Sequence, residues 1–127
     1  MIVSHSHLLA CGIKDLASEL AGNDLRIATA GGLDQGALGT SAERIYQAIL
    51  DVYTEDGVLV LFDLGSALFS AQVAIEMLPV DHQEKIKLSD APIVEGAVVA
   101  AVEASLGQTL EQVSAAVDAT RHMRKVP

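Results

Sequence analysis

Short apolar runs alternate with longer amphipathic segments along the chain. The run at residues 58–62 is apolar at every position, as expected of a central strand covered on both faces. Residues 85–88 alternate polar and apolar, which is typical of an edge strand. Residues 1–4 and 25–29 are the other two predicted strands. The first is shorter than the roughly five or six residues usual for a buried strand, so we expect residues to be missing from its start.

The segments between these runs carry apolar residues at helical spacing. The first predicted helix spans about 8–21 and ends at Gly22, and a polar connection fills 79–84. The other predicted helices are one capped by Thr40 or Ser41, one that follows 63–67 and ends near Met77, one over 93–105 and one capped by Thr109. This alternation predicts a single α/β domain, 1–127, with a doubly wound, mainly parallel sheet and helices on both faces.

Composition narrows the classes of protein that this domain can represent. Half of the 127 residues are hydrophobic, enough to cover both faces of a sheet. The formal net charge of −9 argues against nucleic acid as a partner. Cys11 is the only cysteine, so no internal disulfide is possible, and inside the first helix we interpret it as a packing residue. With no signal segment and no run of about 18 apolar residues, the pattern predicts a cytoplasmic protein without a membrane span.

His5 stands where the first predicted strand ends, and an amphipathic helix follows at once. In α/β sheets, ligands and chemistry collect at the carboxyl ends of parallel strands, where the next helix presents free N–H groups. A histidine there can carry a phosphoryl group, act as a base or bind a metal. It is equally explained as a polar residue that merely ends a strand, and position alone does not separate the two interpretations.

A glycine-rich stretch follows the second predicted strand. Four of nine positions are glycine and two hydroxyl residues come next: Gly31, Gly32, Gly36, Gly39, Thr40 and Ser41. Glycine lets a backbone approach a ligand closely. The spacing nevertheless fits neither the Walker pattern nor the dinucleotide fingerprint. The stretch is therefore either a wall of a binding site or a plain connection.

Asp63 ends the third predicted strand, and Gly65 and Ser66 follow it. In flavodoxin-like strand orders the first and third strands are neighbours at the switch point. Asp63 would then accept a hydrogen bond from one ring nitrogen of His5 and leave the other nitrogen as a nucleophile. Ser66 opens a helix whose N–H groups suit an anion. Taken alone, Asp63 is equally explained as a helix N-cap.

The other three histidines are weaker candidates. His7 lies two residues beyond His5 and is expected to be exposed, which makes it the second choice for a reactive histidine. His82 lies in the polar connection and His122 near the end of the chain. Their spacing does not resemble a set of metal ligands, so we expect no metal site.

Four blocks in order resemble one known family. They are Ile2-Val3-Ser4-His5-Ser6, a Gly-Gly-x-Asp segment running into Gly39-Thr40-Ser41, Asp63-Leu64-Gly65-Ser66-Ala67, and Ser89-Asp90-Ala91-Pro92-Ile93-Val94-Glu95-Gly96-Ala97. The family is the phosphotransferase subunit of phosphoenolpyruvate-dependent dihydroxyacetone kinase, a relative of mannose-type enzyme IIA domains. Mannose-type transport domains carry a Trp-Gly-Gly-Ser-Pro-like segment after the aspartate. This chain has Leu64-Gly65-Ser66-Ala67 there, which favours the kinase subunit.

The resemblance implies a phosphohistidine at His5, loaded by the phosphocarrier protein HPr and oriented by Asp63. The phosphoryl group would pass to ADP on the nucleotide-binding subunit of the kinase, while a third subunit holds dihydroxyacetone. ADP and magnesium are thus expected on the partner, and the domain itself should need no cofactor. The residues expected to border the phosphoryl group or a partner are Ser6, Gly31, Gly32, Gly39, Thr40, Ser41, Gly65 and Ser66.

The same resemblance implies a homodimer that acts in glycerol metabolism. The small residues of the predicted helix at 93–105 suit close approach either to the sheet or to a second subunit. Because the chain ends with the domain, we expect the form without fused HPr-like and enzyme I-like parts. Two alternatives stay open. One is an enzyme IIA domain of a mannose-family sugar transport system. The other is a receiver-like module phosphorylated on Asp63, although receivers need an acidic pair where this chain has Ser4-His5-Ser6.

Overall fold

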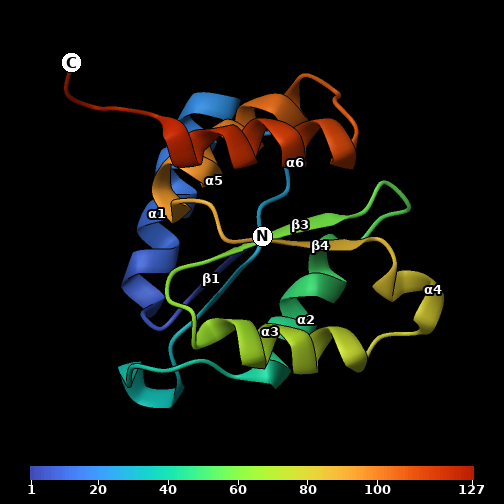
Figure 1. The fold of residues 1–127 in the computed structure, drawn as a ribbon. Helices are drawn as coiled ribbons and strands as arrows, with labels where there is room; N and C mark the ends of the chain where they lie inside the picture. The colour runs from blue at the N-terminus through green and yellow to red at the C-terminus, as the bar shows by residue number, and fades with distance from the viewer.

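The computed structural model describes residues 1–127 as one parallel sheet between two layers of helices (Figure 1). The strands, in the order β2-β1-β3-β4, are β1 Ile2–Ser4, β2 Thr29–Gly31, β3 Val58–Phe62 and β4 Ile86–Ser89. The helices are α1 His7–Ala21, α2 Ala42–Val52, α3 Ala67–Glu76, α4 Val80–Gln83, α5 Ile93–Ser105 and α6 Leu110–Ala119. Two 3-10 turns, η1 Asp34–Gly36 and η2 Thr120–His122, complete the chain. This arrangement confirms the predicted doubly wound α/β class.

Alternate residues of each strand pack on opposite faces of the sheet, because successive side chains of a strand point to opposite sides. On one face, Val3, Val58 and Val60 pack with α2 and α3 in the larger buried cluster. On the other, Ile2 packs with α1 and Leu61 with α6, and α5 contributes to that layer. Figure 1 shows the two layers on opposite sides of the strands. All five residues of β3 are buried, as the continuous apolar run predicts.

The second strand lies further along the chain than its pattern predicts. The apolar run indicated residues 25–29, whereas β2 spans Thr29–Gly31. The register places Thr29 opposite Ile2, so residues 25–27 extend past Met1 and have no neighbouring β1 residue to pair with. Ala28 still accepts a hydrogen bond from the Ile2 N–H at 2.9 Å. The strand therefore runs into the glycine-rich stretch, with Gly31 opposite Ser4.

One helical feature also differs from the sequence prediction. The connection at 79–84 contains the short helix α4, which Pro79 introduces. In α5, whose bounds agree with the prediction, Ala97 and Ala101 are each only 4% exposed. Ala97 packs with α1 and β1 of the same chain. Ala97 and Ala101 therefore serve internal packing, as expected for close approach to the sheet, whereas Val98 and Val102 are only half-buried.

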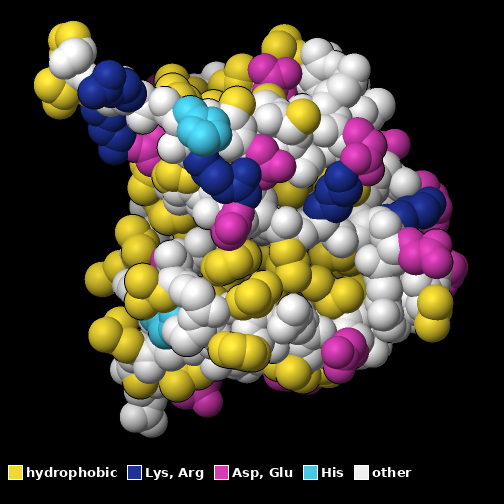
Figure 2. Space-filling model, in the orientation of Figure 1, with side chains coloured by type: hydrophobic (Ala, Val, Ile, Leu, Met, Phe, Trp, Pro, Cys, Tyr) yellow, Lys and Arg dark blue, Asp and Glu magenta, His cyan; other side chains and the backbone are white.

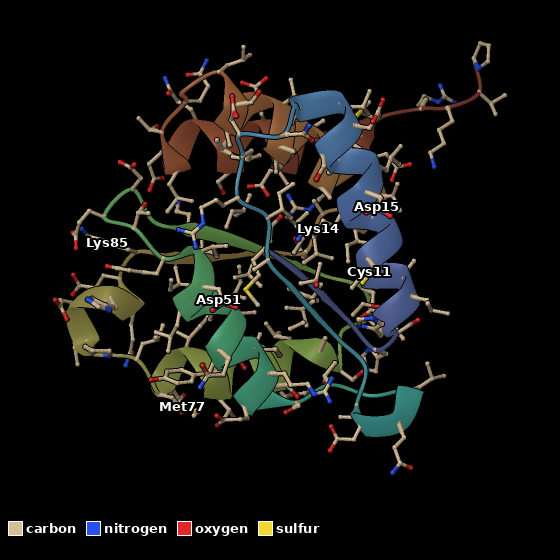
Figure 3. The ribbon with its side chains drawn as sticks, turned by 180° about the vertical axis from the view of Figure 1, so that it is seen from behind. Cys11, Lys14, Asp15, Asp51, Met77 and Lys85 are labelled. Atoms are coloured by element: carbon tan, nitrogen blue, oxygen red, sulfur yellow. The ribbon has the colours of Figure 1, made fainter.

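A cavity of about 150 Å³ lies at the amino ends of the strands. Its lining is almost entirely hydrophobic and includes Leu25, Ile27 and the alanines of α5. A more polar hollow adjoins it, lined in part by Lys14 of α1 and Asp51 of α2, which Figure 3 labels. None of the helices is long and apolar enough to cross a membrane.

Candidate active site at the carboxyl ends of the strands

His5 directly follows β1, the strand that lies between β2 and β3. Its ring is held from both sides. Nδ1 lies 2.9 Å from Oδ1 of Asp63, at the end of β3, and Nε2 lies 2.8 Å from Oγ of Ser66, at the start of α3. The His5 side chain is 25% exposed, so the ring is fixed but can still be reached from solvent.

Asp63 accepts hydrogen bonds at both carboxylate oxygens. Oδ1 receives the His5 ring and the Leu64 N–H at 2.7 Å, while Oδ2 receives the His5 backbone N–H and the Ser4 hydroxyl, each at 2.9 Å. Burial by itself raises the pKa of this carboxyl, but the hydrogen bonds outweigh burial and hold the pKa below its usual value of 3.8. Asp63 is therefore ionised at neutral pH.

The charge of Asp63 determines the proton positions on the His5 ring. An ionised carboxylate only accepts, so Nδ1 carries a proton and donates it to Oδ1. In the neutral ring, Nε2 then bears the lone pair, and the Ser66 hydroxyl donates to it. The nucleophilic nitrogen of His5 is therefore Nε2, on the side of the exposed Ser66.

Ser4 is a site residue that sequence reasoning missed. Its side chain is fully buried, donates to Asp63 and accepts the Ser6 N–H at 3.0 Å. It thus fixes the carboxylate and the turn after β1 together. One sequence signal could have indicated this role. Ser4 is the last residue of a strand whose other residues are apolar, and a buried hydroxyl needs a hydrogen-bond partner.

The start of α3 is open next to Nε2. Ser66 precedes the helix, yet its hydroxyl makes no cap bond within α3 and turns to His5 instead. Gly65 has open space where a side chain would be. Helix N-terminal N–H groups and positive dipole ends favour anions. An anionic group on Nε2 would therefore lie beside a favourable helix end.

The glycine-rich stretch lies against the backbone on either side of His5. The Gly39 N–H donates to the His5 carbonyl at 2.9 Å, and the Gly32 N–H donates to the Ser4 carbonyl at 3.1 Å. At Gly31 an added Cβ would lie 2.7 Å from the Ser6 carbonyl oxygen, so this position accepts no side chain without a shift. The stretch therefore supports the strand end rather than forming a loose connection.

Three of the predicted hydroxyl residues have structural partners of their own. Ser6 and Ser41 are the N-caps of α1 and α2. The Thr40 hydroxyl lies 2.8 Å from that of Ser70 in α3. Among the predicted hydroxyl residues, only Ser66 touches the His5 ring.

The remaining histidines lie apart from this arrangement. His7 is exposed in the first turn of α1, and its Nε2 lies 3.6 Å from Sγ of Cys11. Figure 3 labels Cys11 on the same helix. The His82 ring stacks on Tyr53 with 4.3 Å between the ring centroids. No group of three or more His, Cys, Asp or Glu side chains is arranged to hold a metal ion.

Fold and site together define a doubly wound α/β domain with a carboxylate-oriented histidine at its topological switch point. The family model of the PTS system fructose IIA component matches residues 1–114, and the chain belongs to this family. This match and the relatives described next together confirm the resemblance stated from the sequence blocks.

The curated relatives are phosphoryl donor subunits of phosphoenolpyruvate-dependent dihydroxyacetone kinase, named DhaM. The chain is 41% identical to the Escherichia coli subunit over 89% of its own length, but it spans only about a quarter (25%) of that relative. It is 34% identical to a Listeria innocua subunit over 89% of this chain and 90% of the relative. Single-domain and much longer relatives thus both match.

A solved structure supports the fold. The crystal structure of a protein of unknown function, EF1359, is 32% identical and superposes with a TM-score of 0.86. The match covers 99% of this chain and 96% of the other. The same arrangement of strands and helices therefore extends over nearly the whole of both chains.

Proposed function

We propose that this chain is a phosphohistidine carrier in which Nε2 of His5 holds the phosphoryl group. The observation that carries the proposal is the fixed ring: Nδ1 is bound to the ionised Asp63, and Nε2 is left with its lone pair beside the exposed Ser66. A neutral imidazole held in this way has one nucleophilic nitrogen, already oriented for attack. Similarity to phosphoryl donor subunits supports the same role.

Uptake begins when the Ser66 hydroxyl turns away from Nε2. The Nε2 lone pair attacks the phosphorus of the donor's phosphohistidine, a P–Nε2 bond forms, and the donor's own P–N bond breaks with its electron pair returning to the donor ring. The His5 ring then bears phosphate on Nε2 and a proton on Nδ1, and is positively charged. Asp63 balances that charge at 2.9 Å and keeps the proton on Nδ1.

Discharge runs the same chemistry in reverse. An oxygen of the acceptor attacks the phosphorus, the P–Nε2 bond breaks, and Nε2 regains its lone pair. The protonated, Asp63-bound ring is a good leaving group, so the step needs chiefly an aligned acceptor and positive charge around the phosphoryl oxygens. We propose HPr as the donor and ADP on the nucleotide-binding subunit of dihydroxyacetone kinase as the acceptor, with ADP and magnesium held by that partner.

The first test loads the protein with phosphoenolpyruvate, enzyme I and HPr and maps the phosphate by mass spectrometry. The label should sit on His5 and be labile in acid but stable in base, as a phosphohistidine is. His5→Ala should lose the label, whereas the matched control His7→Ala, on an exposed residue of α1, should keep it. Label retained on a folded His5→Ala variant would contradict the proposal and favour His7.

A second test identifies the acceptor. The phosphorylated protein mixed with ADP and magnesium should make little ATP, and addition of the nucleotide-binding subunit should discharge His5. Further addition of the dihydroxyacetone-binding subunit should yield dihydroxyacetone phosphate. Rapid discharge to free ADP would contradict this division of labour. Discharge only to a membrane component of a sugar transporter would instead assign the protein to sugar transport.

A further inference from the structure

The apolar cavity at the amino ends of the strands is continuous with the polar hollow beside it, at the opposite end of the sheet from His5. The cavity has a volume of about 150 Å³, and 14 of its 16 lining residues are hydrophobic. The hollow is larger, about 510 Å³. Leu25, Arg26, Ile27 and Val52 line both spaces. A single molecule can therefore occupy the cavity and the hollow together.

The hollow is positively charged in a protein whose net charge is −9. Two of its ten lining side chains are cationic, Lys14 and Arg26, and one is anionic, Asp51. Figure 3 shows Lys14 on α1 and Asp51 on α2, on either side of the segment that leads into β2. The side chains of the hollow thus carry one net positive charge next to an apolar cavity.

Both cations of the hollow lack a carboxylate partner. The Lys and Arg side chains that form ion pairs are five of the eight in the chain: Arg44, Lys85, Lys87, Arg121 and Lys125. Of the other three, Arg124 is exposed near the end of the chain, and Lys14 and Arg26 line the hollow. Arg26 donates to the backbone carbonyl of Asp51, and its guanidinium has further N–H donors for a ligand.

We infer that the cavity and the hollow form one binding site for a small amphipathic monocarboxylate. A dry cavity of this volume holds a molecule the size of benzene, so it suits an apolar tail of about six carbon atoms. The tail would lie against Ile27 and Ala100, which line the cavity. The carboxylate would accept hydrogen bonds from Arg26, because a guanidinium binds a carboxylate through two parallel N–H donors.

The charge of the hollow favours a singly charged head group. One carboxylate balances the one net positive charge that Lys14, Arg26 and Asp51 leave together. A dianionic phosphate monoester would exceed that charge, and a neutral alcohol would leave it unbalanced. The inference is independent of the proposed function, because the site is separated from His5 by the length of the strands.

Hexanoate is the probe for this site, and isothermal titration calorimetry on the whole chain at pH 7 measures its binding. Acetate has the same carboxylate without the tail, and hexanol has the same tail without the charge. Hexanoate should bind at least about tenfold more tightly than either. Hexanol binding as tightly as hexanoate, or no binding of hexanoate, would overturn the inference. Tighter binding of hexyl phosphate would overturn the assignment to a monocarboxylate.

Two substitutions separate the tail from the head group. Ala100→Leu places a larger side chain in the cavity and should abolish hexanoate binding. Arg26→Gln should weaken hexanoate binding at least about tenfold. Arg124→Gln is the matched control, since Arg124 also lacks an ion pair but lines neither space. It should leave the dissociation constant unchanged. Arg26 is exposed, so its variant tests the inference even if Ala100→Leu does not fold.

The variants also show where the ligand binds. Hexanoate binding that persists in a folded Ala100→Leu variant would place the tail outside the cavity and overturn the inference. Equal losses in Arg26→Gln and Arg124→Gln would reveal unspecific attraction to cationic side chains, which also overturns it. His5→Ala should bind hexanoate as the unaltered protein does. Failure of hexanoate binding therefore leaves the phosphohistidine proposal intact, and loss of phosphate uptake leaves this site intact.

Discussion

Asp63 is the residue on which the chemistry of His5 depends, because it fixes the ring proton and is itself fixed by four hydrogen bonds. Asp63→Asn keeps the shape but replaces one accepting oxygen with a donating NH₂ group. That group would face an N–H or a hydroxyl that donates, so the ring loses its orientation and its balancing charge. Phosphoryl transfer from HPr should fall at least about tenfold. Rapid-quench kinetics on a variant with an unchanged circular dichroism spectrum would measure this.

An unaltered transfer rate in Asp63→Asn would show that the carboxylate serves only the turn after β3. Asp81→Asn is a suitable control, since Asp81 is an exposed carboxylate on α4 with no contact to His5. It should transfer at the normal rate.

The same carboxylate predicts a pH dependence of stability. Its pKa is lower in the folded protein than the ordinary value of 3.8, so the fold favours the ionised form. Asp63 therefore stabilises the native state above the ordinary carboxyl pKa, and this contribution disappears as the pH falls through the lower folded pKa. Urea unfolding of the unaltered protein and Asp63→Asn at pH 7 and near pH 3 would measure it. The difference between the urea midpoints of the unaltered protein and Asp63→Asn should be smaller near pH 3 than at pH 7. A difference that does not change with pH would contradict this prediction.

At this scale the sequence predicted the contact between His5 and Asp63 but not its support. Strand ends and the right-handed crossover rule bring residues 5 and 63 together, and the 2.9 Å hydrogen bond confirms that contact. The Ser4 hydroxyl escaped prediction because its role depends on how the Asp63 carboxylate is turned, with Oδ2 toward Ser4 and Oδ1 toward the His5 ring. That orientation is a tertiary property, and nothing in the local pattern records it.

Among the elements, the contact between β2 and the start of α1 is unusually tight. A Cβ at Gly31 would lie 2.7 Å from the Ser6 carbonyl oxygen and 2.9 Å from Cβ of Ala10. Gly31→Ala should therefore push α1 from the sheet and lower the free energy of unfolding by about 1–3 kcal/mol. Chemical denaturation would measure the loss, and slower phosphoryl uptake should accompany it because His5 precedes α1.

Gly65→Ala is the matched control, because an added Cβ at Gly65 meets nothing within 4 Å. Its free energy of unfolding should stay within about 0.5 kcal/mol of the unaltered protein. If both substitutions were equally mild, the close approach at Gly31 would not constrain the fold.

The bounds of the helices and strands show where a local sequence pattern is enough to predict an element. β3 and α5 agree with their predicted bounds because a continuous apolar run or a long periodic segment leaves few alternatives. The position of β2 was wrong because pairing with a three-residue β1 overrides the apolar run at 25–29. The helix α4 was missed because four residues are too few for a periodic signal. Short elements are defined by their partners rather than by their own residues.

At the scale of the whole molecule, the apolar cavity of about 150 Å³ leaves packing incomplete at the amino end of the sheet. Ala100 of α5 lines it, and Ala100→Leu should fill part of the space and raise the free energy of unfolding by about 0.5–2 kcal/mol. Ala74→Leu, at a fully buried position of α3 away from the cavity, should lower it by about 1–3 kcal/mol. Thermal and urea unfolding of both variants would measure these changes. An equal change in the free energy of unfolding in the two variants would contradict the prediction.

The homodimer stays a prediction. Association could not use Ala97 and Ala101 of α5, which are buried inside the chain. β4 is an edge strand of the sheet, and an open edge offers unpaired backbone groups for association. Sedimentation should give a species of twice the 13.3 kDa chain mass at micromolar concentration. A single 13.3 kDa species under the same conditions would contradict the expectation.

The strand order β2-β1-β3-β4 places the first strand of the chain in the interior of the sheet. His5 leaves the ribosome early, yet the hydrogen bond that orients it joins residues 58 positions apart. Such long-range parallel pairing forms slowly, because a long loop must close before the contact is gained. A nascent chain that has not reached Asp63 therefore carries a histidine with no fixed tautomer. Under the proposed function, Nε2 is oriented for attack only after β3 has docked, so phosphate acceptance would report that β1 and β3 have paired.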